Sequence, residues 1–118
     1  MMTNVMLGSY PDLFNAGAAS SGVPFGCFRS PTGAIRAWSD QCANGTLVMT
    51  GEQWGNQVRA AFPGYTGRRP RMQLWHGTGD DTLNYQNFIE ETKEWTDVFG
   101  ISQCATAAKE NDPDLLYT

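Results

Sequence analysis

The alternation of apolar and polar positions predicts helix, strand, helix, strand and helix, in that order. The clearest helix covers residues 84–99, where apolar residues recur at intervals of three and four. Its predicted apolar face consists of Tyr85, Phe88, Ile89, Thr92, Trp95 and Phe99. Its predicted solvent-facing side consists of Glu90, Glu91, Lys93 and Glu94. Gly100 follows directly and is expected to end the helix in a left-handed conformation.

A second helix and a strand are predicted in the middle of the chain. Trp54, Val58 and Ala61 share one stripe of a helix over residues 52–61, and Thr50 precedes it as the expected N-cap. Residues 71–75 form a short apolar run that predicts a strand. A polar turn rich in glycine follows this strand.

The first half of the chain is less regular. Residues 1–9 predict a short helix with Met2, Val5, Met6 and Ser9 on one side. No capping residue precedes Met1, so we expect the chain to begin inside a helix. Small residues over 14–22 predict a buried strand that allows close approach of a helix. Repeated glycine and proline over 23–51 predict a long, functional loop.

The order of these elements favours an α/β fold with a parallel sheet flanked by helices. A parallel sheet is normally buried on both faces and needs more than two strands. We therefore expect a partial sheet that is incomplete at both ends.

Composition and charge exclude some classes of partner. Hydrophobic residues make up 41% of the 118 residues and charged residues 17%, which is typical of a globular domain. The net charge of −4 disfavours binding to nucleic acid, and residues 68–71 are interpreted as a basic loop that enters a strand. No apolar run is long enough to span a membrane.

Three cysteines and a sequon favour a secreted protein. A disulfide between Cys27 and Cys42 would staple the long loop, although two free, partly buried thiols remain the alternative. Asn44 begins an N-glycosylation sequon beside Cys42. Cys104 is left over, as a free thiol or as the partner of a cysteine outside this chain. Because Met1 does not begin a signal peptide, we expect the chain to start inside a longer secreted protein.

The turn after residues 71–75 carries the candidate chemistry. The pattern H-G-x-x-D from His76 to Asp80 resembles the acid-bearing turn of α/β-hydrolases, in which the aspartate accepts the N–H of a distant histidine. In that fold the histidine follows the acid along the chain, so His76 is interpreted as a residue that pins the turn. A role as the triad base is the alternative. Metal binding by His76, Asp80 and Asp81 lacks a spaced partner cluster, and we predict no metal site.

No serine lies in a G-x-S-x-G elbow. Ser20 and Ser21 follow the small-residue strand but lack the glycine on their amino side, so both are interpreted as loop serines. A small self-contained enzyme that uses one of them with His76 is the least favoured interpretation.

Several unusual strings, in order, resemble fungal acetylxylan esterases, carbohydrate esterases grouped with feruloyl esterases and polyhydroxybutyrate-depolymerase-like enzymes. These strings occupy residues 1–6, 10–14, 21–27, 38–45, 54–59, 63–70 and 75–78. The resemblance implies a partial α/β-hydrolase fold, with residues 1–118 as the central-to-late part of a single esterase domain. It places the nucleophile elbow before Met1 and the catalytic histidine after Thr118.

The resemblance also implies an activity. It predicts a serine carboxylesterase that deacetylates xylan by a Ser-Asp-His mechanism, with Asp80 as the catalytic carboxylate and no cofactor. Because the serine and histidine are missing, the isolated chain is expected to be inactive. Trp38 is the candidate wall of the acyl or sugar pocket, with packing of the loop as its alternative role. The full-length protein is expected to be an extracellular monomer.

A function of another class is also considered. In it, the chain is a degenerate, non-catalytic secreted domain that binds xylan through exposed tryptophans.

Overall fold

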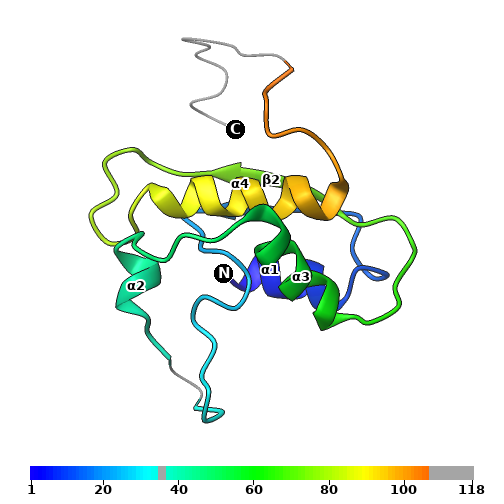
Figure 1. Ribbon diagram of the computed structural model, residues 1–118, viewed down its shortest axis with the longest axis horizontal. Helices are drawn as coiled ribbons and strands as arrows, with labels where there is room; N and C mark the ends of the chain where they lie inside the picture. The colour runs from blue at the N-terminus through cyan, green and yellow to red at the C-terminus, as the bar shows by residue number, and fades with distance from the viewer. Residues whose placement is uncertain (35–36, 107–118) are drawn as a thin grey trace.

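The computed structural model describes residues 1–34 and 37–106 (Figure 1). Its elements are α1 (Met2–Ser9), β1 (Ala16–Ser20), α2 (Asp40–Ala43), α3 (Gly51–Ala61), β2 (Arg71–Trp75) and α4 (Gln86–Phe99). All five predicted elements are present. The one-turn helix α2 was not predicted. It forms inside the long loop because the Ser39 side chain caps it by accepting the N–H of Cys42.

Strands β1 and β2 form a parallel two-stranded sheet, in register from Ala16 beside Arg71 to Ser20 beside Trp75. The expected partial α/β architecture with a parallel sheet is thus confirmed. Both strands end at the same edge, and the N–H of Ser21 extends the ladder by donating to the Trp75 carbonyl at 2.9 Å. In parallel sheets this carboxyl edge is where functional loops gather.

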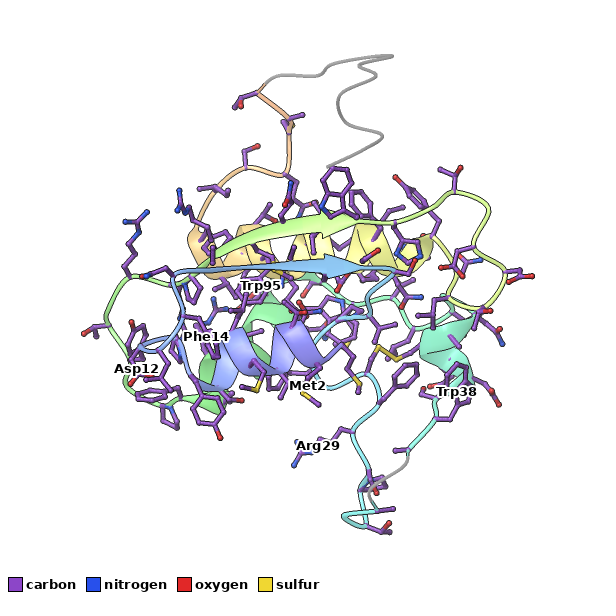
Figure 2. The ribbon with its side chains drawn as sticks, turned by 180° about the vertical axis from the view of Figure 1, so that it is seen from behind. Met2, Asp12, Phe14, Arg29, Trp38 and Trp95 are labelled. Atoms are coloured by element: carbon purple, nitrogen blue, oxygen red, sulfur yellow. A yellow bond between two sulfur atoms is a disulfide. The ribbon has the colours of Figure 1, made fainter. Side chains whose placement is uncertain are left out.

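Helices α1 and α4 cover one face of the sheet. In Figure 2 the two strands lie in front of α4, and α1 and α3 lie below the strands. Met72 and Leu74 of β2 pack against a core formed by Leu7, Val58 and Trp95. Opposite Met72, Gly17 gives α1 room, because a Cβ there would lie 2.8 Å from a Leu7 methyl.

The prediction that the first strand is buried was wrong. Only Ala19 of β1 is buried, and Ala16, Ala18 and Ser20 are exposed. The reason is that no described helix covers their face of the sheet, and no third strand pairs with either edge within residues 1–34 and 37–106.

Helix α3 begins as predicted. The Thr50 hydroxyl accepts the N–H of Gln53, and the Gln53 side chain accepts the N–H of Thr50, so the two residues form a capping box. Trp54 and Val58 are buried on the predicted stripe. Gly100 ends α4 with a φ of 66°, also as predicted.

The predicted orientation of α4 was wrong. Glu90, Glu91 and Glu94 are almost completely buried, whereas Ile89 of the predicted apolar face is 40% exposed. Trp95 is the residue of that face that does enter the core. A pattern of polar and apolar positions predicts that carboxylates face solvent. Carboxylates can nevertheless be buried when donors of the protein form hydrogen bonds with them.

Each buried carboxylate has a donor from a distant segment. Glu90 accepts the Trp54 indole N–H at 2.8 Å, and Glu94 accepts the backbone N–H of Phe25 at 2.7 Å. Glu91 accepts the side-chain amide of Asn4. These bonds tie α4 to α3, to α1 and to the loop after β1.

Asn4 also decides which face of α1 is buried. Asn4, Leu7 and Gly8 face the core, so the predicted stripe that begins with Met2 lies outside it. The Asn4 amide donates to the Val23 carbonyl at 2.7 Å, and its oxygen accepts the Trp95 indole N–H at 3.0 Å. One polar side chain thus joins α1, the loop and α4.

Cys27 and Cys42 form a disulfide with a Cα–Cα distance of 5.9 Å. It belongs to a small core with Val23 and Trp54, which fixes the long loop to α3. Cys104 is free and exposed within the part of the chain that the structure describes. None of the described helices is both long and apolar enough to cross a membrane.

The disulfide should contribute strongly to stability. Replacing both Cys27 and Cys42 with serine is expected to lower the free energy of unfolding by about 3 kcal/mol, because a bridge over 15 residues restricts the unfolded chain. Urea unfolding followed by tryptophan fluorescence measures this change. The Cys104→Ser variant is the control and should unfold like the wild type. An unchanged midpoint in the double variant would contradict the expected contribution.

Candidate active site

The candidate site lies where both strands end. Ser21 follows β1, and the turn of residues 76–83 follows β2. Both segments leave the carboxyl edge of the parallel sheet, toward which the strand arrows point in Figure 2. The sheet therefore brings together two segments that are more than 50 residues apart in the sequence.

The turn holds the Asp80 carboxylate in a fixed position. One carboxylate oxygen, Oδ1, accepts the N–H of Leu83 at 2.9 Å and the N–H of Thr82 at 3.0 Å. The Asp80 N–H donates to the Gly77 carbonyl at 3.2 Å and closes the turn. The second oxygen, Oδ2, lies 3.7 Å from His76 Nε2, and the side chain is 17% exposed.

These interactions keep Asp80 ionised. The Leu83 N–H contributes most to lowering the pKa of this carboxyl group, followed by the Ser21 hydroxyl and the Thr82 N–H. The nearby His76 adds a smaller effect in the same direction. Asp80 is therefore an anion at neutral pH, as a carboxylate that accepts the N–H of a histidine must be.

His76 pins the turn, as interpreted from its place in the sequence. Its buried Nε2 lies 2.8 Å from the Leu83 carbonyl, and its ring packs edge-on against Tyr85 with the centroids 5.9 Å apart. Its Nδ1 is buried and has no hydrogen-bond partner among the described residues. His76 thus contacts no serine hydroxyl there, which disfavours its alternative role as a triad base.

The two candidate serines differ in conformation. Ser20 is the exposed last residue of β1. Ser21 has a φ of 44°, and it is the only residue other than glycine with a positive φ in the described parts of the chain. The left-handed backbone of Ser21 was not predicted from the sequence, because glycine is the residue expected at a positive φ.

The aromatic ring of Trp38 is exposed. It is 62% exposed and stacks on Phe28, with ring centroids 4.9 Å apart and an interplanar angle of 17°. Its indole N–H donates to Asp40 at 3.0 Å, which fixes the ring orientation. Figure 2 shows Trp38 beside α2, toward the end of the molecule where the strands terminate.

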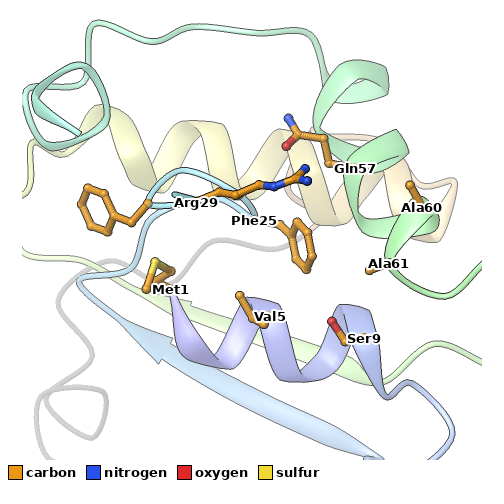
Figure 3. A pocket seen from close by; sticks show the side chains of 10 residues that line it. Met1, Val5, Ser9, Phe25, Arg29, Gln57, Ala60 and Ala61 are labelled. Carbon is orange, nitrogen blue, oxygen red and sulfur yellow. The ribbon is translucent and has the colours of Figure 1, made fainter. Parts of the chain in front are cut away.

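The structure also contains an apolar groove that the sequence analysis did not anticipate. The groove has a volume of about 490 Å³ and lies between α1, α3 and the loop of residues 25–29 (Figure 3). Val5, Phe25 and Ala61 line it, and Arg29 and Gln57 add polar groups. No residue of the turn 76–83 reaches it. Residues 1–34 and 37–106 include no group of three or more His, Cys, Asp or Glu side chains arranged to hold a metal ion.

Comparison with known proteins identifies relatives of this chain. No protein-family model matches. The chain is 46% identical over 118 residues to a probable acetylxylan esterase A of Aspergillus fumigatus, covering 99% of this chain and 32% of that protein. It is 46% identical to an acetylxylan esterase of Coprinopsis cinerea, covering 100% of this chain and 31% of that protein. It is also 46% identical to feruloyl esterase B of Talaromyces stipitatus, covering 100% of this chain and 33% of that protein.

A solved structure agrees with these relatives. The acetyl xylan esterase from Aspergillus awamori superposes with a TM-score of 0.84 at 47% identity, covering 89% of this chain and 38% of that chain. This chain spans about a third of the length of its curated relatives. Sequence and fold agree over almost the whole chain, which is therefore similar to fungal acetylxylan and feruloyl esterases over about a third of their length.

Proposed function

We propose that this chain supplies the acid-bearing part of a Ser-Asp-His esterase that deacetylates xylan. The observation that carries the proposal is the ionised Asp80 carboxylate, held by two backbone N–H groups at the carboxyl edge of the sheet. The names of the relatives, acetylxylan esterase above all, supply the reaction class. In this proposal residues 1–118 are the central-to-late portion of one α/β-hydrolase domain.

The proposed reaction is acyl transfer. A serine outside this chain attacks the acetyl carbonyl while a histidine, also outside it, takes the serine proton and passes it to the leaving sugar oxygen. Backbone N–H groups stabilise the oxyanion. Asp80 orients the imidazole and stabilises the imidazolium that forms. Water then releases acetate by the same route. The mechanism uses no metal ion or organic cofactor.

We also propose that the full-length protein is extracellular and acts as a monomer. The Cys27–Cys42 disulfide fits an oxidising compartment. Asn44, at the end of α2, is exposed and accessible to an attached glycan. The substrate is then acetylated xylan or a related plant cell-wall polysaccharide.

The proposal is tested with a chimera. Residues 1–106 replace the matching segment of the Aspergillus awamori enzyme, and the proposal places the serine and the histidine in the rest of that enzyme. The chimera is expected to hydrolyse 4-nitrophenyl acetate, whereas the isolated chain is expected to show only the buffer rate. A folded but inactive chimera would contradict the proposal. Hydrolysis by the isolated chain that is lost in Ser20→Ala or His76→Ala would instead support the self-contained enzyme.

A non-catalytic role in binding xylan finds less support. Trp54 and Trp95 are buried and Trp75 is partly buried, which leaves Trp38 as the one exposed tryptophan of the four. One exposed ring is a small platform for a polysaccharide, so we assign Trp38 to the esterase substrate instead.

Trp38 should affect the affinity for polymeric xylan but not the affinity for a small ester. Trp38→Ala in the chimera is expected to raise KM for acetylated xylan about fivefold, since one stacking contact is lost, with kcat nearly unchanged. Trp38→Phe keeps an aromatic face and should recover most of the affinity. KM for 4-nitrophenyl acetate serves as the control and should not change. Equal losses on both substrates would show that Trp38 acts by packing the loop.

A further inference from the structure

Three of the eight lysine and arginine residues of this acidic chain occur within residues 68–71, and the proposed reaction does not use them. We propose that Arg68 and Arg71 bind the carboxylate groups of an acidic polysaccharide, at a site separate from Asp80. This inference rests on the proposed function only for the kind of substrate, a plant cell-wall polysaccharide. It is carried by the position of the two arginines, by their exposed guanidinium groups and by the two hollows beside them.

The arginines lie at the edge of the sheet opposite to the candidate active site. Arg71 is the first residue of β2, whereas the turn that contains Asp80 follows Trp75, the last residue of this strand. A strand of five residues separates its two ends by about 13 Å. The strand arrows in Figure 2 begin at the edge of the arginines and point toward the other one. A ligand bound by the arginines therefore leaves the carboxyl edge free for the reacting ester.

Tyr65 and Arg69 fix the loop that carries the two exposed arginines. The Tyr65 hydroxyl donates to the Arg68 carbonyl at 3.1 Å, and Cζ of Arg69 lies 5.2 Å from the centroid of the Tyr65 ring. The Arg71 N–H donates to the Asn15 carbonyl at 3.0 Å. The backbone of Arg68 and Arg71 is thus held in place, so a ligand does not have to order it on binding.

The guanidinium groups of Arg68 and Arg71 are available to a ligand. Both residues are exposed, and neither forms an ion pair with a carboxylate of residues 1–34 and 37–106. A guanidinium group donates two parallel hydrogen bonds to a carboxylate, which makes arginine typical of carboxylate-binding sites. The chain has a net charge of −4 and as a whole repels an acidic polymer. The local excess of positive charge at residues 68–71 offsets this repulsion.

Two hollows flank the arginines, and both Arg68 and Arg71 line each of them. The larger hollow has a volume of about 660 Å³ and an apolar wall to which Val98 and Phe99 contribute. The smaller hollow has a volume of about 340 Å³, and the exposed Asp12 contributes a polar group to it. Sites for organic ligands combine apolar walls with a few polar groups in this way. Because the hollows extend on both sides of the arginines, they fit an extended polymer better than a small anion.

Residues 107–118 carry three acidic side chains and are another source of carboxylates. Ile101 lines the larger hollow, but residues 102–106 are all exposed, and no hydrogen bond joins them to the arginines. In Figures 1 and 2 the chain after α4 leaves the body of the molecule. These observations favour a separate polymer as the ligand.

The test is the binding of polygalacturonate, a polymer of uronic acid, to the full 118-residue chain, measured by isothermal titration calorimetry. Arg68→Gln and Arg71→Gln are each expected to raise Kd about threefold, and the double variant about tenfold, because each removes one exposed ion pair. Arg29→Gln removes the same charge from another exposed arginine and should leave Kd unchanged. Asp12→Asn removes a repelling carboxylate from the smaller hollow and should lower Kd about twofold.

The same titrations with neutral xylan, which has no carboxylate groups, are the control for the ligand. The arginine variants should not change its Kd. An equal loss of affinity for neutral xylan would contradict the recognition of carboxylates.

The site is overturned if the arginine double variant binds polygalacturonate as tightly as the wild type, or if the wild type does not bind it. Binding that appears only after Glu110, Asp112 and Asp114 are replaced by their amides would overturn it too, since residues 107–118 would then occupy the arginines. The proposed function fails by a different outcome, because calorimetry requires no catalysis. A folded but inactive chimera contradicts the esterase and leaves the effects of Arg68→Gln and Arg71→Gln on Kd unaltered.

Discussion

Asp80→Asn in the chimera is expected to lower kcat for 4-nitrophenyl acetate by about 10⁴-fold, with KM nearly unchanged. A 10⁴-fold loss of kcat is the usual effect of replacing the acid of a Ser-His-Asp triad by its amide. Asparagine has the same shape and can still accept the Leu83 and Thr82 N–H groups, so the turn should persist. What is lost is the negative charge that orients the imidazole and stabilises it once protonated.

Asp81→Asn is the matched control. Asp81 is the next residue, is exposed, and accepts a bond only from the hydroxyl of Thr82 among the described residues. Its amide variant should retain the activity of the chimera. If Asp80→Asn retains more than about a tenth of kcat, the assignment of Asp80 to the triad is wrong.

The second large effect concerns stability and pH. Burial raises the pKa of Glu94 to about 8, against an ordinary value of 4.5, and the neighbouring Glu91 acts in the same direction. The folded protein therefore binds a proton that the unfolded chain releases. This contribution is complete below pH 4.5 and is lost as the pH rises toward 8. The free energy of unfolding should fall by up to about 1.4 kcal/mol per pH unit in this window, or about 5 kcal/mol in total.

Glu94→Gln isolates this effect. The amide is neutral at every pH and can still accept the N–H of Phe25. The variant should therefore be more stable than the wild type at pH 8 and similar to it at pH 5. Urea unfolding at the two pH values measures the difference. Equal pH dependence in the wild type and Glu94→Gln would contradict the assignment to Glu94.

Glu90 provides a control of opposite sign. Burial alone would raise its pKa, but donors led by Lys93 and Trp54 reverse the effect and lower the pKa. The contribution of Glu90 is thus present above its ordinary pKa of 4.5 and lost as the pH falls. Glu90→Gln should destabilise the protein at pH 7 by about 1–3 kcal/mol, because Lys93 loses the carboxylate with which it pairs at 2.6 Å.

The elements that the sequence predicted well are those with local causes. The strand over residues 71–75 follows from a short apolar run, and the start of α3 follows from Thr50 and Gln53, three residues apart. The end of α4 follows from Gly100. Each of these signals acts within one or two turns of chain, so it can be read without the tertiary structure.

Burial of the α4 carboxylates has distant causes. Glu90 is held by Trp54, which is 36 residues away, and the Asn4 side chain accepts the Trp95 indole N–H over 91 residues. A periodic pattern assigns these side chains by polarity alone and places them in solvent. Their partners become visible only when α1, α3 and α4 are packed together.

The candidate site likewise combines features with local causes and features with distant causes. The position of Asp80 after a strand, and the role of His76 within the turn, are local features that the sequence predicted. The proximity of the segment after β1 to the turn of Asp80 depends on the parallel register that places Ser20 beside Trp75. The left-handed backbone of Ser21 has no sequence signal either, since glycine is the residue expected there.

Our central proposal is that this chain forms the acid-bearing part of an acetylxylan esterase site. Its most direct test is acetate release from acetylated xylan by the chimera, compared with the parental Aspergillus awamori enzyme under the same conditions. We predict release within about tenfold of the parental rate, and release at least a thousandfold slower in the chimera with Asp80→Asn. A chimera that folds and binds acetylated xylan but releases no acetate would contradict the claim.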